Sequence, residues 1–186
     1  MFELSELRLK GAFVIESYCF EDSRGSFNKF YVDKDYNNIG VGFRVSEAFV
    51  SISNKNVIRG MHFQLRKPQA KLIRVISGKV QDVLVDLRKE SATYGKWEKV
   101  ELSGANHRTL YIPAGFAHGF LSCEDNTAML YQCEGDYDKE TDTGIVFDDP
   151  VIGVDWDIDL KEAIVSDKDR SLMSFYEYER NHIRLE

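Results

Sequence analysis

Residues 56–64 read Asn-Val-Ile-Arg-Gly-Met-His-Phe-Gln, and residues 71–75 soon afterwards read Lys-Leu-Ile-Arg-Val. Both stretches have the apolar content of buried β-strands, yet they carry Arg59, His62 and Lys71. Desolvating an unpaired charge is costly, so a cation in such a strand needs a partner or a ligand. These three side chains therefore indicate a pocket.

A second glycine-flanked histidine follows downstream. Residues 112–120 read Ile-Pro-Ala-Gly-Phe-Ala-His-Gly-Phe, which includes His118, and Tyr131 comes shortly after. A single histidine among apolar residues is more often a hydrogen-bonded core residue than a catalytic one. Two of them in one β-rich chain indicate a shared cavity.

Composition limits the class of protein. The chain has 186 residues, enough for one domain with a substantial core. Its 43% hydrophobic and 12% aromatic content favours β-structure, and its net charge of −7 argues against nucleic acid or a membrane as partner. The three cysteines are too few for a disulfide framework, and the sequence predicts no signal peptide. We expect a cytoplasmic protein with reduced thiols.

Short apolar segments separated by turn residues recur along the chain, the pattern of a sandwich or barrel. We expect strands at residues 4–20 with a turn at Gly11, and at 26–31, 43–52, 57–63, 70–76, 80–87, 97–102, 108–112, 118–123 and 128–133. A short helix is expected at 33–39. The sequence thus predicts an all-β jelly-roll barrel in one domain. It would comprise an N-terminal ribbon (1–20), a core (about 21–158) and a helical tail (about 159–186).

Several kinds of chemistry lack their motifs. A catalytic metal would need converging histidines and a carboxylate, but His62 is followed by Gln64, while His107 lies in a polar loop and His182 in the tail. The chain has neither a Gly-x-Ser-x-Gly elbow nor a Gly-x-x-x-x-Gly-Lys-Ser/Thr phosphate loop. We therefore expect no catalytic metal.

Proton chemistry remains. An imidazole exchanges protons near neutral pH, so His62 is a candidate base, and the Tyr131 phenol is a candidate acid. The Lys71 ammonium is suited to stabilise an oxyanion. Together with Arg24 and Arg59, it also has the chemistry to hold a diphosphate.

Motifs across nearly the whole chain resemble the dTDP-4-dehydrorhamnose 3,5-epimerase family. They occur in order at residues 22–25, 59–64, 71–74, 86–91, 113–120, 130–131, 148–150, 153–156 and 166–169. The resemblance implies a cofactor-free, homodimeric, cupin-type jelly roll that acts on nucleotide-linked 4-keto-6-deoxy sugars. It implies His62 as the base next to the ketone, Asp169 as its partner and Tyr131 as the acid on the opposite face. It also implies that Lys71 lies near the C4 oxygen, that His118 lines the pocket, and that Arg24 and Arg59 bind the phosphates. Gln64 is expected to contact the substrate beside them.

The chain departs from the family pattern where thymine would bind. Lys29 replaces a glutamate, residues 47–49 read Glu-Ala-Phe instead of Gln-Asp-Asn, and Asp136-Tyr137 replaces a Tyr-Tyr pair. Lys29 and Glu47 either pair with each other or recognise a different base. A carboxylate accepts well from the amine of cytosine or the N–H donors of guanine. We therefore expect Lys29, Glu47 and Tyr137 at a subsite for dTDP, CDP or GDP.

The sequence thus predicts an epimerase that inverts C3, C5 or both in a nucleotide-diphospho-4-keto-6-deoxyhexose, for deoxysugar or surface-polysaccharide synthesis. One alternative is a 3,4-ketoisomerase, which also uses a His- and Tyr-lined jelly roll. A non-catalytic nucleotide-sugar binding protein is the other, although such a protein has no need of an opposed acid and base. The resemblance predicts a homodimer, in which the ribbon at residues 4–20 is able to add a strand to a partner sheet.

Overall fold

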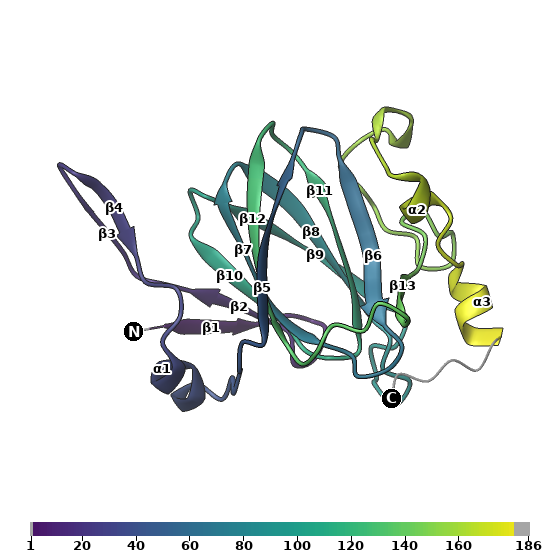
Figure 1. Ribbon diagram of the computed structural model, residues 1–186, viewed down its shortest axis with the longest axis horizontal. Helices are drawn as coiled ribbons and strands as arrows, with labels where there is room; N and C mark the ends of the chain where they lie inside the picture. The colour runs from purple at the N-terminus through teal and green to yellow at the C-terminus, as the bar shows by residue number, and fades with distance from the viewer. Residues whose placement is uncertain (1, 181–186) are drawn as a thin grey trace.

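Two antiparallel β-sheets face each other in the computed structural model, which describes residues 2–180 (Figure 1). The first sheet has the order β1-β2-β10-β7-β12-β5 and the second has the order β13-β6-β11-β8-β9. The strands of the first are Glu3–Glu6, Phe13–Glu16, Arg108–Ile112, Ala70–Ser77, Thr127–Glu134 and Glu47–Ser53, and those of the second are Asp142–Gly144, Ile58–Gln64, Phe116–Ser122, Lys79–Asp86 and Trp97–Ser103. This is the predicted cupin-type jelly roll.

The main core lies between the two sheets. Alternate residues of facing strands meet there, among them Ile73 and Val75 from β7 and Leu84 from β8. Strand β8 is buried on both faces, because Val83 and Val85 point instead into a second core. Double burial explains why its sequence is almost continuously apolar, without the polar alternation of a half-exposed strand.

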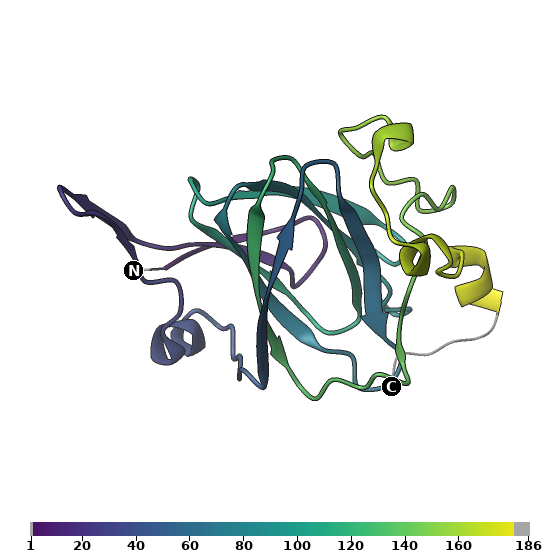
Figure 2. The same ribbon diagram turned by 45° about the horizontal axis from the view of Figure 1, so that its top comes forward.

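The C-terminal segment covers the outer face of the second sheet. It contains a 3₁₀ helix (η1, Leu160–Glu162) and two short α-helices, α2 (Asp167–Arg170) and α3 (Phe175–Arg180). Trp156, Phe175 and Tyr178 pack with the outward residues of β6 and β8, and both views place α2 and α3 on this side of the barrel (Figures 1 and 2). The expected helical tail is therefore three short turns of helix docked onto a sheet. None of the helices among residues 2–180 has the length and apolar character needed to cross a membrane.

The N-terminal region forms a ribbon and a separate hairpin. Strand β2 pairs with β10 of the same chain, so in this structure the ribbon completes its own sheet. Helix α1 (Asp33–Asn38), where a helix was predicted, packs beneath it through Tyr36. Between them, β3 (Cys19–Asp22) and β4 (Gly25–Asn28) form a two-stranded hairpin that projects away from the barrel and exposes Phe20 and Phe27 (Figure 1).

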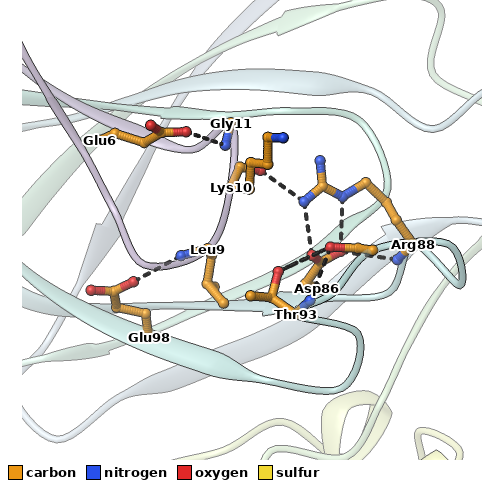
Figure 3. Close-up of polar contacts among 9 residues, drawn as sticks. Glu6, Leu9, Lys10, Gly11, Asp86, Arg88, Thr93 and Glu98 are labelled. Atoms are coloured by element: carbon orange, nitrogen blue, oxygen red, sulfur yellow. Dashed lines mark hydrogen bonds and ion pairs between the residues drawn. The ribbon is translucent and has the colours of Figure 1, made fainter.

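Polar contacts fasten the loop between β1 and β2 to the end of the barrel (Figure 3). The buried Asp86 carboxylate accepts hydrogen bonds from Arg88, Ser91 and Thr93. Burial alone would raise the pKa of Asp86, but these donors hold it below its usual range. Arg88 also donates to the carbonyl oxygen of Lys10 at 2.8 Å, which ties the loop to the barrel.

The predicted strands are found in the structure, with differences at several of their ends: β4, for example, ends at Asn28 and not at residue 31. Strand β5 begins at Glu47, because Phe43 packs in the cluster around α1 and not in the sheet. The predicted helical tail (about 159–186) is helical only in short pieces within residues 159–180, and residues 181–186 lie outside the described residues. Strand β13 was missed, because Asp142-Thr143-Gly144 is too short and polar to show a strand pattern.

Candidate active site

A cavity of about 580 Å³ lies between the sheets, within the size range of small-ligand sites. Its walls come mainly from β5, β7 and β12 of the first sheet and from β6 and β11 of the second. The predicted site residues that line it are Glu47, Arg59, His62, Gln64, Lys71, His118, Tyr131 and Tyr137. The two stretches that the sequence singled out therefore share one pocket.

His62 pairs with a buried carboxylate at the pocket wall. Its Nε2 lies 2.9 Å from Oδ1 of Asp169, in α2, and Oδ2 of Asp169 accepts a hydrogen bond from the Gly60 amide at 3.2 Å. Burial raises the pKa of Asp169, but the hydrogen bond from His62 outweighs this and keeps the pKa below its usual value. An ionised carboxylate only accepts hydrogen bonds, so Nε2 of His62 carries the proton. Nδ1 is then the nitrogen free to take another.

Tyr131 lies on the opposite sheet from His62. It belongs to β12 and is only 7% exposed, with the Phe49 ring stacked on it. Burial raises the pKa of the phenol, and the neighbouring Ser51 hydroxyl partly offsets the rise. The phenol therefore keeps its proton at neutral pH. The cavity thus has an imidazole on one wall and a protonated phenol on the other.

Lys71 and His118 also line the cavity. Burial lowers the pKa of Lys71, while nearby acidic groups, including Asp82 and Asp142, oppose that effect. His118 Nε2 lies 3.0 Å from both carboxylate oxygens of Asp82. Burial raises the pKa of Asp82, and His118 counteracts it. An ammonium in this position is suited to stabilise negative charge that develops on a substrate oxygen.

Gln64 lines the cavity as expected, and its side chain is hydrogen-bonded to backbone groups of the same chain. Its amide nitrogen donates to the carbonyl oxygens of Lys67 and Asp136, and its oxygen accepts from the Asp138 amide at 2.8 Å. These contacts join two loops at the pocket rim. The Gln64 side chain therefore shapes the pocket, with its polar atoms committed to the backbone.

Arg24 and Lys29 lie outside the cavity of their own chain. Arg24 is exposed on the β3–β4 hairpin, where it donates to Asp22 at 2.6 Å, and Lys29 is exposed just after β4. The expectation that Arg24, Arg59 and Lys71 meet is therefore not met within one chain. Likewise, no ion pair joins Lys29 to Glu47 in residues 2–180 of a single copy.

Some residues at the site were not among the predicted site residues. Phe49 and Ser51 line the cavity together with Glu47, because alternate residues of β5 share one face. The period of two was present in the sequence and would have identified them. Asp82 gave no local signal, because its link to His118 arises only when β8 and β11 pair.

A group of potential metal ligands lies elsewhere. The ligand atoms of Cys19, Glu21 and His107 lie within 4.8 Å of one another. The buried Arg74 guanidinium lies 3.5 Å from Nδ1 of His107. Its fixed positive charge opposes the binding of a cation there.

The fold is a jelly roll, and its cavity has an imidazole paired with a carboxylate on one wall and a buried phenol on the other. This combination is typical of a cupin-type isomerase that uses acid–base chemistry. The comparison with known proteins is more specific. The chain belongs to the dTDP-4-dehydrorhamnose 3,5-epimerase family, whose model matches residues 6–177.

Individual relatives agree with this assignment. The chain is 44% identical to the dTDP-4-dehydrorhamnose 3,5-epimerase of Methanothermobacter thermautotrophicus over 171 residues, or 91% of this chain and 92% of that one. A solved 3,5-epimerase from Legionella pneumophila, in complex with dTDP-4-keto-L-rhamnose, superposes with a TM-score of 0.94 at 32% identity, covering 100% of this chain and 99% of that one. A 3′-monoepimerase from Streptomyces bikiniensis, in complex with dTDP-quinovose, superposes with a TM-score of 0.87 at 28% identity, covering 96% of this chain and 90% of that one.

Proposed function

We propose that this protein is a cofactor-independent epimerase of a nucleotide-diphospho-4-keto-6-deoxyhexose, acting in cytoplasmic deoxysugar synthesis for surface polysaccharides. The observation that carries the proposal is the placement of His62 with Asp169 on one sheet side of the cavity and Tyr131 on the other. The 3,5-epimerase relatives support it over a ketoisomerase or a binding protein.

The proposed mechanism follows from the acidity of a C–H bond next to a ketone. Nδ1 of His62 removes the proton, and Asp169 stabilises the imidazolium that forms. The electron pair moves onto the C4 oxygen, where Lys71 stabilises the enolate. Tyr131 then protonates the carbon from the other face, and its phenolate recovers a proton from solvent, which completes the inversion.

The residues expected to bind the nucleotide base are the ones that depart from the family pattern. Glu47 lines the cavity near Tyr137, whose ring is half exposed and free to stack on a base. A carboxylate in this position accepts hydrogen bonds from N–H donors, which cytosine and guanine present in greater number than thymine. We therefore include CDP- and GDP-linked sugars beside the dTDP-linked sugar as candidate substrates.

The test is deuterium exchange in D2O with the 4-keto-6-deoxyglucose forms of dTDP, CDP and GDP. We expect NMR to show deuterium entering C3, C5 or both for one nucleotide in clear preference. The preferred nucleotide identifies the base, and the labelled positions identify the carbons that react. Absence of exchange with all three would overturn the proposal.

The position of Arg24 supports a homodimer as the active form. Its hairpin projects from the barrel with Phe20 and Phe27 exposed, which is unfavourable for an isolated chain. Arg59, in contrast, lines the cavity, and among residues 2–180 its one side-chain hydrogen-bond partner is the Ser53 hydroxyl at 3.2 Å. We propose that the hairpin of a second copy docks at the cavity mouth and brings Arg24 to the phosphates beside Arg59.

Co-expression of two inactive variants tests this arrangement. An Arg24→Ala chain paired with a His62→Ala chain has one intact site, because His62 and Arg24 of that site come from different copies. Random pairing should then restore about a quarter of wild-type activity. Homodimers of each variant are the controls. Failure to regain activity in a mixed dimer, or a monomer by light scattering, would contradict the shared site.

A further inference from the structure

Strand β5 places an aromatic ring directly against the proposed acid. Phe49 and Tyr131 are opposite partners in the antiparallel pairing of β5 with β12, so their side chains share the cavity face. The ring centroids are 4.6 Å apart and the planes differ by 13°. Stacked cross-strand aromatic pairs stabilise each other beyond the area they bury. One face of the Tyr131 ring is therefore covered by Phe49.

The other restraints on Tyr131 are weaker. The His118 and Tyr131 rings lie in a T-shaped arrangement, with centroids 6.1 Å apart. Ser51, two residues along β5, brings its hydroxyl near the phenol, but Ser51 Oγ makes no hydrogen bond of good geometry within residues 2–180. A phenol with so few polar contacts depends on ring packing for its orientation. The Phe49 stack is the most extensive of these contacts.

We propose that Phe49 is a positioning residue that holds the Tyr131 ring so that its O–H group meets the carbon deprotonated by His62. The proposal rests on the epimerase function set out above. Phe49 is 46% exposed and lines the cavity together with Tyr131.

Proton removal and reprotonation can be measured separately, which distinguishes a positioning role of Phe49 from a general structural role. Proton removal belongs to His62, which lies on β6 of the other sheet. The His62 side chain is 32% exposed, so its acquired proton exchanges with D2O before it returns to the carbon. Exchange therefore needs only the base, whereas inversion also needs a correctly placed acid. Loss of Phe49 should therefore slow inversion and leave exchange nearly unchanged.

The experiment compares exchange and inversion rates in Phe49→Ala and wild-type protein, using NMR in D2O with the preferred substrate. Because displacing a reacting group by about 1 Å can cost about 100-fold, we expect inversion to fall by about 10- to 100-fold. Exchange should stay within about threefold. Phe49→Tyr keeps the flat ring and should restore inversion. Val50→Ala, on the opposite face of β5 and 57% exposed in the wild type, should change neither rate.

Phe49→Leu guards against a folding defect, because leucine fills much of the volume without offering a flat ring. It should show the same separation of the two rates. Equal loss of exchange and inversion in folded Phe49→Ala and Phe49→Leu would overturn the proposal, and so would unchanged inversion. Failure of wild-type protein to exchange any of the three sugars would instead count against the epimerase function itself.

Discussion

His62→Ala is expected to reduce both deuterium exchange and inversion by at least about 1,000-fold, at the upper end of what a general base contributes. The reason is that the described cavity offers no equivalent replacement. His118, the other imidazole there, has its Nε2 engaged by the fully buried Asp82. Tyr131 keeps its proton and so cannot act as the base. Rates measured by NMR in D2O, with product analysis, provide the test.

Binding should survive in the same variant. The groups proposed to hold the nucleotide, Arg59 and Glu47, lie on β6 and β5 and do not depend on the imidazole. Calorimetry with the nucleoside diphosphate should therefore give a Kd within about threefold of wild type. His107→Ala, a histidine outside the cavity, is the matched control and should retain both rates. An active His62→Ala protein would assign the base to another residue.

The strands and the residues that line the cavity could be predicted from the sequence, because both have local signals. Apolar residues with a period of two predicted the strands, and polar residues inside such strands, such as His62 and Lys71, predicted the cavity. Its opposed walls could not be obtained this way. Which strands face each other depends on the order β1-β2-β10-β7-β12-β5 in one sheet and β13-β6-β11-β8-β9 in the other, and that order is set by tertiary pairing.

Residues whose roles depend on distant partners were predicted least well. Gln64 was assigned to substrate because of its place in the motif, and the structure shows that its amide also bonds to the backbone of Asp136, 72 residues further along the chain. Arg24 and Lys29 were expected at the pocket, whereas in a single chain Arg24 lies on the exposed β3–β4 hairpin and Lys29 is exposed just after it. The stack of Phe49 on Tyr131 also needed the β5–β12 register. In each case the sequence gives the residue type, and only strand pairing gives its contact.

Gly60→Ala is expected to have the largest effect on stability, because strands β6 and β11 approach each other closely at this position. Backbone strain and overpacking should lower the free energy of unfolding by about 3–5 kcal/mol. Gly60 has a φ of +132°, a conformation that other residues rarely adopt. A Cβ there would lie 2.5 Å from the Gly119 Cα and 3.0 Å from the His118 carbonyl oxygen. These are backbone atoms, so no side-chain rotation relieves the clash. Urea unfolding should show a lower midpoint at an unchanged m-value.

The same substitution should also lower catalysis in the protein that remains folded. The Gly60 amide donates to Asp169, so moving the strand disturbs the carboxylate that orients His62. Gly42→Ala is the matched control, because Gly42 lacks a positive φ and its nearest neighbour would be an Asn37 side-chain atom at 3.6 Å. That variant should be as stable as wild type, or slightly more so through reduced freedom of the unfolded chain. A Gly60→Ala protein with wild-type stability would mean that β6 and β11 can separate without cost, contrary to their tight packing beneath the catalytic pair.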